Sequence, residues 1–147
     1  MNSTIILKGN ILYTPNPSAL VSIQQGYVIA VDGVVVHCGE SIPTVYTEYD
    51  VVDYGDNLII PGFVDTHAHA PQYCNRGLGM DKELLPWLET YTFPEEAKFI
   101  DPDYARLVYG AFVHDLWRNG TTRSILFGTI HGVDGAFTKS RIVSLCG

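Results

Sequence analysis

Short apolar runs separated by turn residues characterise the first sixty residues. The five runs are Ile5–Leu7, Ile11–Tyr13, Tyr27–Val31, Val34–Cys38 and Val51–Tyr54. Gly9-Asn10 lies between the first two runs, and Asp32-Gly33 lies between the third and the fourth. Because Asp-Gly tolerates the positive φ angles of a type I′ turn, the second pair predicts a tight hairpin. Residues 1–60 are therefore predicted to form a small antiparallel β domain.

The spacing of the apolar positions changes after residue 60. Pro61-Gly62 precedes a predicted strand over Phe63–His69, and another strand is expected over Thr121–Thr129. A long helix is predicted between them over Asp103–Asn119, and a shorter one, rich in Leu and Trp, over Glu83–Tyr91. A strand, a helix and a strand of this length form a βαβ unit, and such units build parallel sheets covered by helices. The predicted fold class is α/β, with residues 61–147 as the opening of a larger α/β domain.

Both ends of the longer helix carry recognisable signals. Asp101 suits the N-cap, Pro102 the first helical position, and Gly120 the position after the C-cap. Its apolar residues recur at steps of three and four, which predicts one buried face. The residues expected on that face are Tyr104, Val108, Ala111, Phe112 and Leu116.

Composition and charge narrow the class of partner. The net charge is -7 with nine lysine and arginine residues, which argues against nucleic acid or an anionic membrane surface. The chain lacks the run of about 20 apolar residues that spans a bilayer, and its start lacks the pattern of a signal peptide. We expect a cytoplasmic protein in which Cys38, Cys74 and Cys146 are reduced thiols without a special role.

Two histidines at the end of the predicted strand Phe63–His69 are the strongest chemical signal. Side chains two positions apart on a strand point to the same face, so His67 and His69 should leave the sheet together, with Asp65 on that face as well. A pair of converging neutral imidazoles suits a divalent transition metal, zinc above all. We therefore predict that His67 and His69 are metal ligands.

The string from Pro61 to His69 resembles the first barrel strand of the amidohydrolase superfamily. Its continuation looks like that of the guanine deaminase family within this superfamily, and the resemblance spans residues 4–131. The residues that carry it are Ala70-Pro71-Gln72-Tyr73, residues 79–88 and 91–96, Asn119-Gly120-Thr121-Thr122 and Thr129-Ile130-His131. Residues 61–96 are its most specific part.

This resemblance implies a zinc-dependent hydrolase that converts guanine and water to xanthine and ammonia. It implies the start of a (β/α)8 TIM-type barrel over residues 61–131, preceded by part of a small β-sandwich domain over residues 1–60. His67 and His69 match zinc ligands, and His69, Ala70, Pro71 and Gln72 match the stretch that contacts the purine. The Gln72 carboxamide offers a donor and an acceptor to the mixed edge of guanine. A homodimer is left open for the full-length enzyme.

Several expected parts of such an enzyme fall beyond residue 147. They are a further histidine ligand, a glutamate that shuttles protons and an aspartate from the last strand, so the catalytic acid and base are unknown. Residues 132–147 form an atypical tail that suggests a truncated or frameshifted reading. We therefore expect the chain to be an N-terminal fragment that is inactive and not stably folded alone. The alternatives are a related amidohydrolase acting on a pterin, triazine or cytosine ring, and a non-catalytic binding fragment.

The remaining candidate residues are weaker. His131 follows the second predicted strand, where it either faces the site or lies in a loop, whereas His37 and His114 are interpreted as structural or solvated. Trp87 and Phe93 either cover a flat ligand or pack the rim of the barrel. Four carboxylates are interpreted as helix-start and surface groups rather than as acid/base catalysts: Glu95, Glu96, Asp101 and Asp103.

Overall fold

The computed structural model describes residues 3–129. The chain divides into two units, Met1–Pro61 and Gly62–Gly147. We call them the N-terminal unit and the C-terminal unit. The tail 132–147, with Cys146, and His131 lie outside the described residues. Among the helices described, none is long and apolar enough to cross a membrane.

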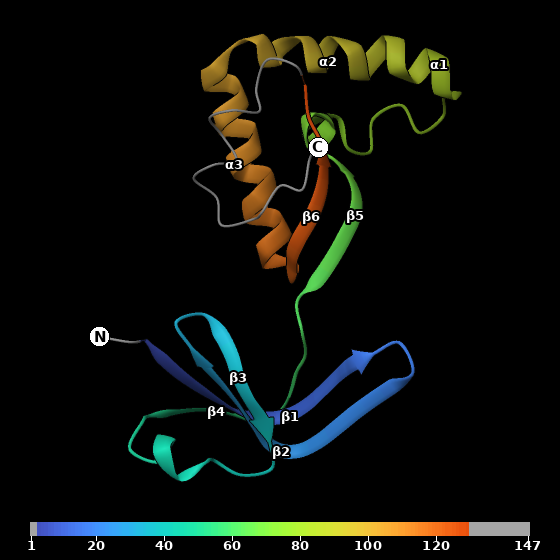
Figure 1. Ribbon diagram of the computed structural model, residues 1–147. Helices are drawn as coiled ribbons and strands as arrows, with labels where there is room; N and C mark the ends of the chain where they lie inside the picture. The colour runs from blue at the N-terminus through green and yellow to red at the C-terminus, as the bar shows by residue number, and fades with distance from the viewer. Residues whose placement is uncertain (1–2, 130–147) are drawn as a thin grey trace. The chain divides into compact units, whose positions relative to one another are not determined.

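The N-terminal unit is a four-stranded sheet in the order β3-β2-β1-β4 (Figure 1). Its strands are β1 (Thr4–Asn16), β2 (Ala19–Val31), β3 (Val34–Gly39) and β4 (Val51–Ile59), with a 3-10 turn η1 (Thr44–Tyr46) before β4. The predicted hairpin is confirmed, because Asp32 and Gly33 join β2 to β3 with φ angles of 50° and 80°. Both angles are positive, as a type I′ turn requires.

Two details of the N-terminal unit differ from the prediction. Gly9-Asn10 is not a turn but an irregularity within the single long strand β1, where the pairing with β2 shifts between Gly9 and Ile11. The Asn10 side chain fills this step by accepting from the Gln25 backbone N at 3.1 Å and donating to the Asp56 backbone O at 2.9 Å. The predicted all-antiparallel order is also wrong for β4, which pairs with β1 in parallel. The segment after β3 is long enough to carry the chain back across the sheet.

The C-terminal unit is a parallel strand pair with helical segments between its strands. Its elements are β5 (Phe63–His69), the 3-10 turn η2 (Ala70–Asn75), α1 (Leu84–Trp87), the π-turn η3 (Leu88–Thr92), α2 (Phe93–Ala97), the 3-10 turn η4 (Lys98–Ile100), α3 (Pro102–Arg118) and β6 (Thr121–Phe127). In Figure 1, α3 runs beside the β5–β6 pair. The predicted α/β class and the βαβ unit are thus confirmed. The short helix expected over Glu83–Tyr91 continues as a helical run to Ile100.

The predicted ends of α3 are confirmed. The Asp101 side chain accepts from the Asp103 backbone N at 2.9 Å, and Pro102 occupies the first turn. Asn119 is the C-cap, and Gly120 follows with a φ of 80°. A glycine meets this angle without the strain that a Cβ would add.

The buried face of α3 is rotated relative to the prediction. Ala111, expected on that face, is exposed, whereas Ala105 is 1% exposed. The buried residues of the helix are Ala105, Val108, Tyr109, Phe112 and Val113. They follow steps of three and four as expected. The predicted face was wrong because Ala111 was counted as a buried apolar position in the same way as the larger apolar residues.

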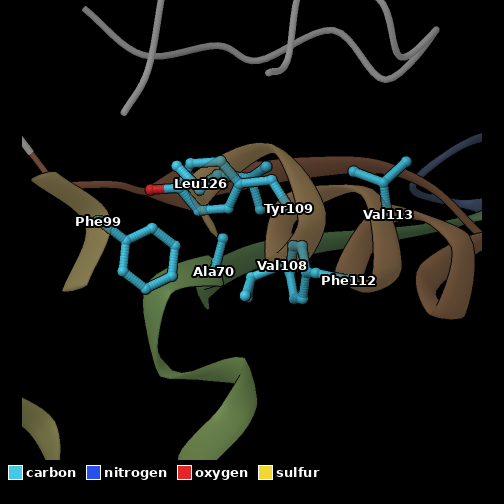
Figure 2. Packing of buried hydrophobic residues seen from close by; sticks show 8 residues of the cluster. Ala70, Phe99, Val108, Tyr109, Phe112, Val113 and Leu126 are labelled. Carbon is cyan, nitrogen blue, oxygen red and sulfur yellow. The ribbon is translucent and has the colours of Figure 1, made fainter. Parts of the chain in front are cut away.

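The core of the C-terminal unit lies where α3 packs on η2, η4 and β6 (Figure 2). Phe99 and Tyr109 are fully buried, with ring centroids 5.0 Å apart. Ala70, the residue directly after β5, is fully buried in the same cluster, and Leu126 enters it from β6. This packing fixes the chain immediately after the predicted metal ligands.

One substitution at two positions of α3 tests this assignment of the buried face. In the full-length protein, Ala105→Leu should lower the free energy of unfolding by about 1–3 kcal/mol, because added methyl groups overpack a filled core. Ala111→Leu should change it by less than about 0.5 kcal/mol, since that position is exposed. Urea unfolding of both variants measures the difference, and equal effects would contradict the assignment.

Gly110 within α3 and Gly120, directly after its C-cap, provide a second test. A Cβ at Gly110 meets no atom within 4 Å, so Gly110→Ala should stabilise the helix by about 0.5–1 kcal/mol. Gly120→Ala should destabilise by about 1 kcal/mol, because it forces a residue with a Cβ to keep a φ of 80°. The thermal unfolding midpoints of the two variants, made in the full-length protein, should therefore shift in opposite directions.

Candidate active site

The C-terminal end of β5 brings the two predicted metal ligands together. The Nε2 atoms of His67 and His69 lie 3.0 Å apart, and the ring centroids are separated by 5.0 Å. Both residues are exposed. Asp65, expected beside them, accepts instead from the backbone N of His67 at 3.0 Å. Its carboxylate is therefore engaged with the strand's own backbone.

The separation of the two imidazoles bears on whether they fit a metal ion. Nitrogen ligands about 2.0–2.1 Å from a tetrahedral ion lie about 3.3 Å from one another. The observed 3.0 Å is close to that value, so the pair fits one edge of a tetrahedral site. Within residues 3–129, no three histidine, cysteine, aspartate or glutamate side chains gather closely enough to hold a metal ion. The described residues thus supply a pair of donors, and the role of this pair stays a prediction.

Phe127, at the end of β6, is a neighbour that the sequence analysis missed. Its ring lies 4.8 Å from that of His67 and 4.9 Å from that of His69, and it stacks on His69 at an interplanar angle of 15°. The pairing of β5 with β6 places Phe127 directly opposite His69. The expected parallel pairing of these strands was the signal that could have found it.

The four residues that the resemblance assigns to substrate contact differ in how far they are exposed to solvent. Ala70 and Pro71 are fully buried, so their side chains serve the packing of η2. Gln72 is partly exposed, and its Nε2 lies 3.4 Å from Nδ1 of His69. His69 and Gln72 are therefore the members of the set that are open to a ligand, and all four roles stay predictions.

Glu96 is a second residue that the sequence analysis did not place in the site. Its Oε1 accepts from the Gln72 Nε2 at 3.2 Å. Glu96 also lies in the first turn of α2, so the helix-start interpretation holds, but its carboxylate additionally contacts a candidate binding residue. Asp101 and Asp103 have the expected structural roles, as the N-cap of α3 and an exposed ion pair with Arg106.

Glu95, the residue before Glu96, has different partners. It is 7% exposed, accepts from the Lys98 Nζ at 2.6 Å and also accepts from the Tyr104 hydroxyl. Burial opposes ionisation of Glu95, but the hydrogen bonds from Lys98 and Tyr104 outweigh it and lower the pKa of the carboxyl. Burial and the bond to Glu95 raise the pKa of Tyr104. This cluster stabilises the ionised carboxylate inside the fold.

A cavity of about 450 Å³ opens beside His69 and Gln72. Its lining includes Met80, Trp87, Phe112 and Asp115. The residues that line the cavity come from the end of β5, η2, the following loop, α1, and α3 with its C-cap, all within the C-terminal unit.

Trp87 lines this cavity and is fixed by a hydrogen bond from its Nε1 to the Leu78 backbone O at 2.8 Å. Phe93 is 55% exposed and is not among the described lining residues. Of these two aromatic candidates, the cavity therefore involves Trp87.

Polar groups at the cavity wall are linked to one another. The Tyr73 hydroxyl donates to Asp115 Oδ2 at 2.5 Å, which raises the pKa of Tyr73 and lowers that of Asp115. The guanidinium of Arg76 lies 3.8 Å from the centre of the Tyr73 ring and 3.4 Å from Asp115 Oδ2. The charged groups on this wall thus already have partners within the protein.

Two further histidines and two cysteines lie within the described chain. His37 contacts the Ser41 backbone O through Nε2 at 2.9 Å, and His114 is exposed on α3. Cys38 and Cys74 are free thiols, as expected.

Comparison with known proteins places this arrangement in a family. The model of the amidohydrolase family matches residues 58–141. A guanine deaminase from Dictyostelium discoideum is 56% identical over 81 residues, covering 55% of this chain and 18% of that protein. The guanine deaminase of Escherichia coli strain K12 is 38% identical over 133 residues, covering 87% of this chain and 30% of that protein. The chain thus spans less than a third of the length of these relatives.

A solved structure agrees with the sequence matches. The crystal structure of guanine deaminase from C. acetobutylicum with guanine bound in its active site superposes with a TM-score of 0.80. The two chains are 46% identical, and the match covers 88% of this chain and 31% of the other. The family match covers more than half of the chain, so this chain belongs to the amidohydrolase family.

Proposed function

We propose that the protein containing this chain is a guanine deaminase, which hydrolyses guanine to xanthine and ammonia. The observation that carries the proposal is the pair of imidazoles at the end of β5, with Nε2 atoms 3.0 Å apart and Gln72 beside them. The likeness to guanine deaminases over 87–88% of the chain, one of them with guanine bound, supports it.

The fold proposed for the whole protein is a (β/α)8 barrel preceded by a small β domain. In this proposal β5, α3 and β6 form the first strand, helix and strand of the barrel, and residues 4–59 form part of the β domain. The parallel pairing of β5 with β6 supports it. Active sites of such barrels lie at the carboxyl ends of the strands, where His69 and Phe127 face one another.

His67 and His69 are proposed as two ligands of a zinc ion. A bound zinc ion would supply a Lewis acid that makes water an effective nucleophile near neutral pH. For the two histidines to serve as ligands, each imidazole must present an unprotonated nitrogen. Phe127, stacked on His69, would hold that ring in place and limit the access of water from one side. The remaining ligands and the proton-shuttling carboxylate are expected from later parts of the protein.

Gln72 and the adjoining cavity are proposed to bind the purine. The cavity volume of about 450 Å³ falls in the usual range of small-ligand sites. The indole of Trp87 offers an apolar wall, while Gln72 offers a hydrogen-bonding group at the histidine end. A flat ring with polar edges suits this combination of surfaces.

Removal of either imidazole tests the metal proposal. In the full-length protein, His67→Ala and His69→Ala should each abolish guanine turnover. Each should also lower the zinc affinity by more than about 10–100-fold, which is the loss typical when a residue that only supports a metal ligand is removed. His114→Ala removes an exposed imidazole on α3 and should change neither. Zinc is measured by competition with a chelator. Wild-type zinc retention in both strand variants would contradict the assignment.

Replacement of Gln72 tests the substrate proposal. Gln72→Ala should lower kcat/KM for guanine by about 10–100-fold, because a polar edge of the buried substrate loses its partner at a cost of about 1–3 kcal/mol. Gln24→Ala makes the same change at an exposed position of β2 and should leave the kinetics unaltered. Xanthine formation is followed by absorbance. Unchanged guanine kinetics in Gln72→Ala would exclude this contact.

A further inference from the structure

The carboxamide of Gln72 is held by groups from two other elements. Gln72 lies on η2, its Nε2 donates to Oε1 of Glu96 on α2 at 3.2 Å, and the same Nε2 lies 3.4 Å from Nδ1 of His69 at the end of β5. Within the described part of the chain, Gln72 Oε1 makes no hydrogen bond. The nitrogen end of the carboxamide is thus engaged, and the oxygen end is free.

The chemistry of Glu96 decides which end is engaged. An ionised carboxylate accepts hydrogen bonds and cannot donate them, so the end of the carboxamide that faces it must be the NH2 group. A hydrogen bond with an ionised partner is about twice as strong as one between neutral groups. His69 Nδ1 exerts less control, because its contact is longer. When His69 binds zinc through Nε2, as proposed above, Nδ1 carries the proton and cannot accept from the Gln72 NH2, which leaves Glu96 as its acceptor. Glu96 therefore dominates the orientation.

The position of Glu96 is itself fixed by buried contacts. The π-turn η3 precedes α2, and Thr92 at its end is 1% exposed. The Asn75 Nδ2 donates to the Thr92 Oγ1 at 3.2 Å, which ties η3 to η2, the element that carries Gln72. Glu96 and Gln72 thus lie on two segments that are joined by a buried hydrogen bond.

We propose that Glu96 is a positioning residue that turns the Gln72 carboxamide so that its oxygen, an acceptor, is left for the substrate. The proposal rests on the function proposed above. It assigns Gln72 to a ligand N–H group, which guanine carries at N1, and narrows the expected contact of Gln72 from a donor and an acceptor to the acceptor alone. If a ligand carried an acceptor at that position, its lone pair would face the lone pair of the Gln72 oxygen. The two acceptors would repel each other, and the ligand would bind weakly.

The test uses two purines whose hydrogen-bonding patterns are inverted. Guanine has a donor at N1 and an acceptor at O6, whereas 2,6-diaminopurine has an acceptor at N1 and a donor at the 6-amino group. The variant is Glu96→Gln in the full-length protein, in which a neutral amide no longer dictates how Gln72 is turned. The matched control is Glu89→Gln, which makes the same change at an exposed position of η3.

The measurements are KM and kcat for guanine and the inhibition constant of 2,6-diaminopurine. In the wild type guanine should be strongly preferred, and Glu96→Gln should reduce this preference about tenfold, mainly through KM and the inhibition constant with kcat less affected. Glu89→Gln should retain the wild-type preference. An unchanged preference in Glu96→Gln, with guanine turnover intact in the wild type, overturns the positioning role. A purely structural role would lower stability without changing the preference.

A readout independent of turnover separates this proposal from the proposed function. The side-chain NH2 resonance of Gln72 in the ¹⁵N-labelled protein is assigned by its loss in Gln72→Ala. Glu96→Gln should shift this resonance and speed its hydrogen exchange, and Glu89→Gln should not. A wild type without guanine turnover would refute the proposed function, and this resonance would still report on the contact. If Glu96→Gln leaves the resonance unchanged, the positioning role is refuted.

Discussion

The packing of one face of α3 against β6, η2 and η4 is the interaction on which the rest of the C-terminal unit depends. A pair of strands has little stability of its own, so burial of apolar area against a helix must supply it. Tyr109 and Leu126 are almost fully buried in this core, and Ala70 anchors the chain at the residue after His69. The same apolar contacts that stabilise the fold therefore determine where the polar ends of β5 and η2 lie.

Local signals in the sequence predicted the parts of the fold that local chemistry determines. Asp32-Gly33 specified its turn through backbone angles, and Asp101 specified the start of α3 through one hydrogen bond. The errors came from contacts between distant residues. Asn10 joins β1 to segments 15 and 46 positions away, and β4 pairs in parallel with β1 after a connection that no short motif encodes. Ala111 was misplaced because alanine fits either face of a helix.

In the candidate site, too, the local pattern predicted some residues, and contacts between distant residues supply the others. The convergence of His67 and His69 follows from the two-residue period of a strand, and the structure has it. Phe127 and Glu96 reach the site from 58 and 24 positions beyond His69 and Gln72, through strand pairing and helix packing. A residue type alone did not distinguish Glu96 from a surface carboxylate. Only its partner did, and that partner is set by the tertiary fold.

The adjacent carboxylates Glu95 and Glu96 show how this division of roles arises physically. Neighbouring residues in a helix of 3.6 residues per turn point about 100° apart, so the two cannot share one environment. Glu95 turns to Lys98 and Tyr104, where hydrogen bonds compensate for its burial, and Glu96 turns to Gln72. The π-turn before α2 adds one residue to the hydrogen-bonded ring and so changes which side chains of α2 face η2. The step between neighbouring helix positions and the register set by the π-turn together place one carboxylate where it stabilises the fold and its neighbour where it contacts Gln72.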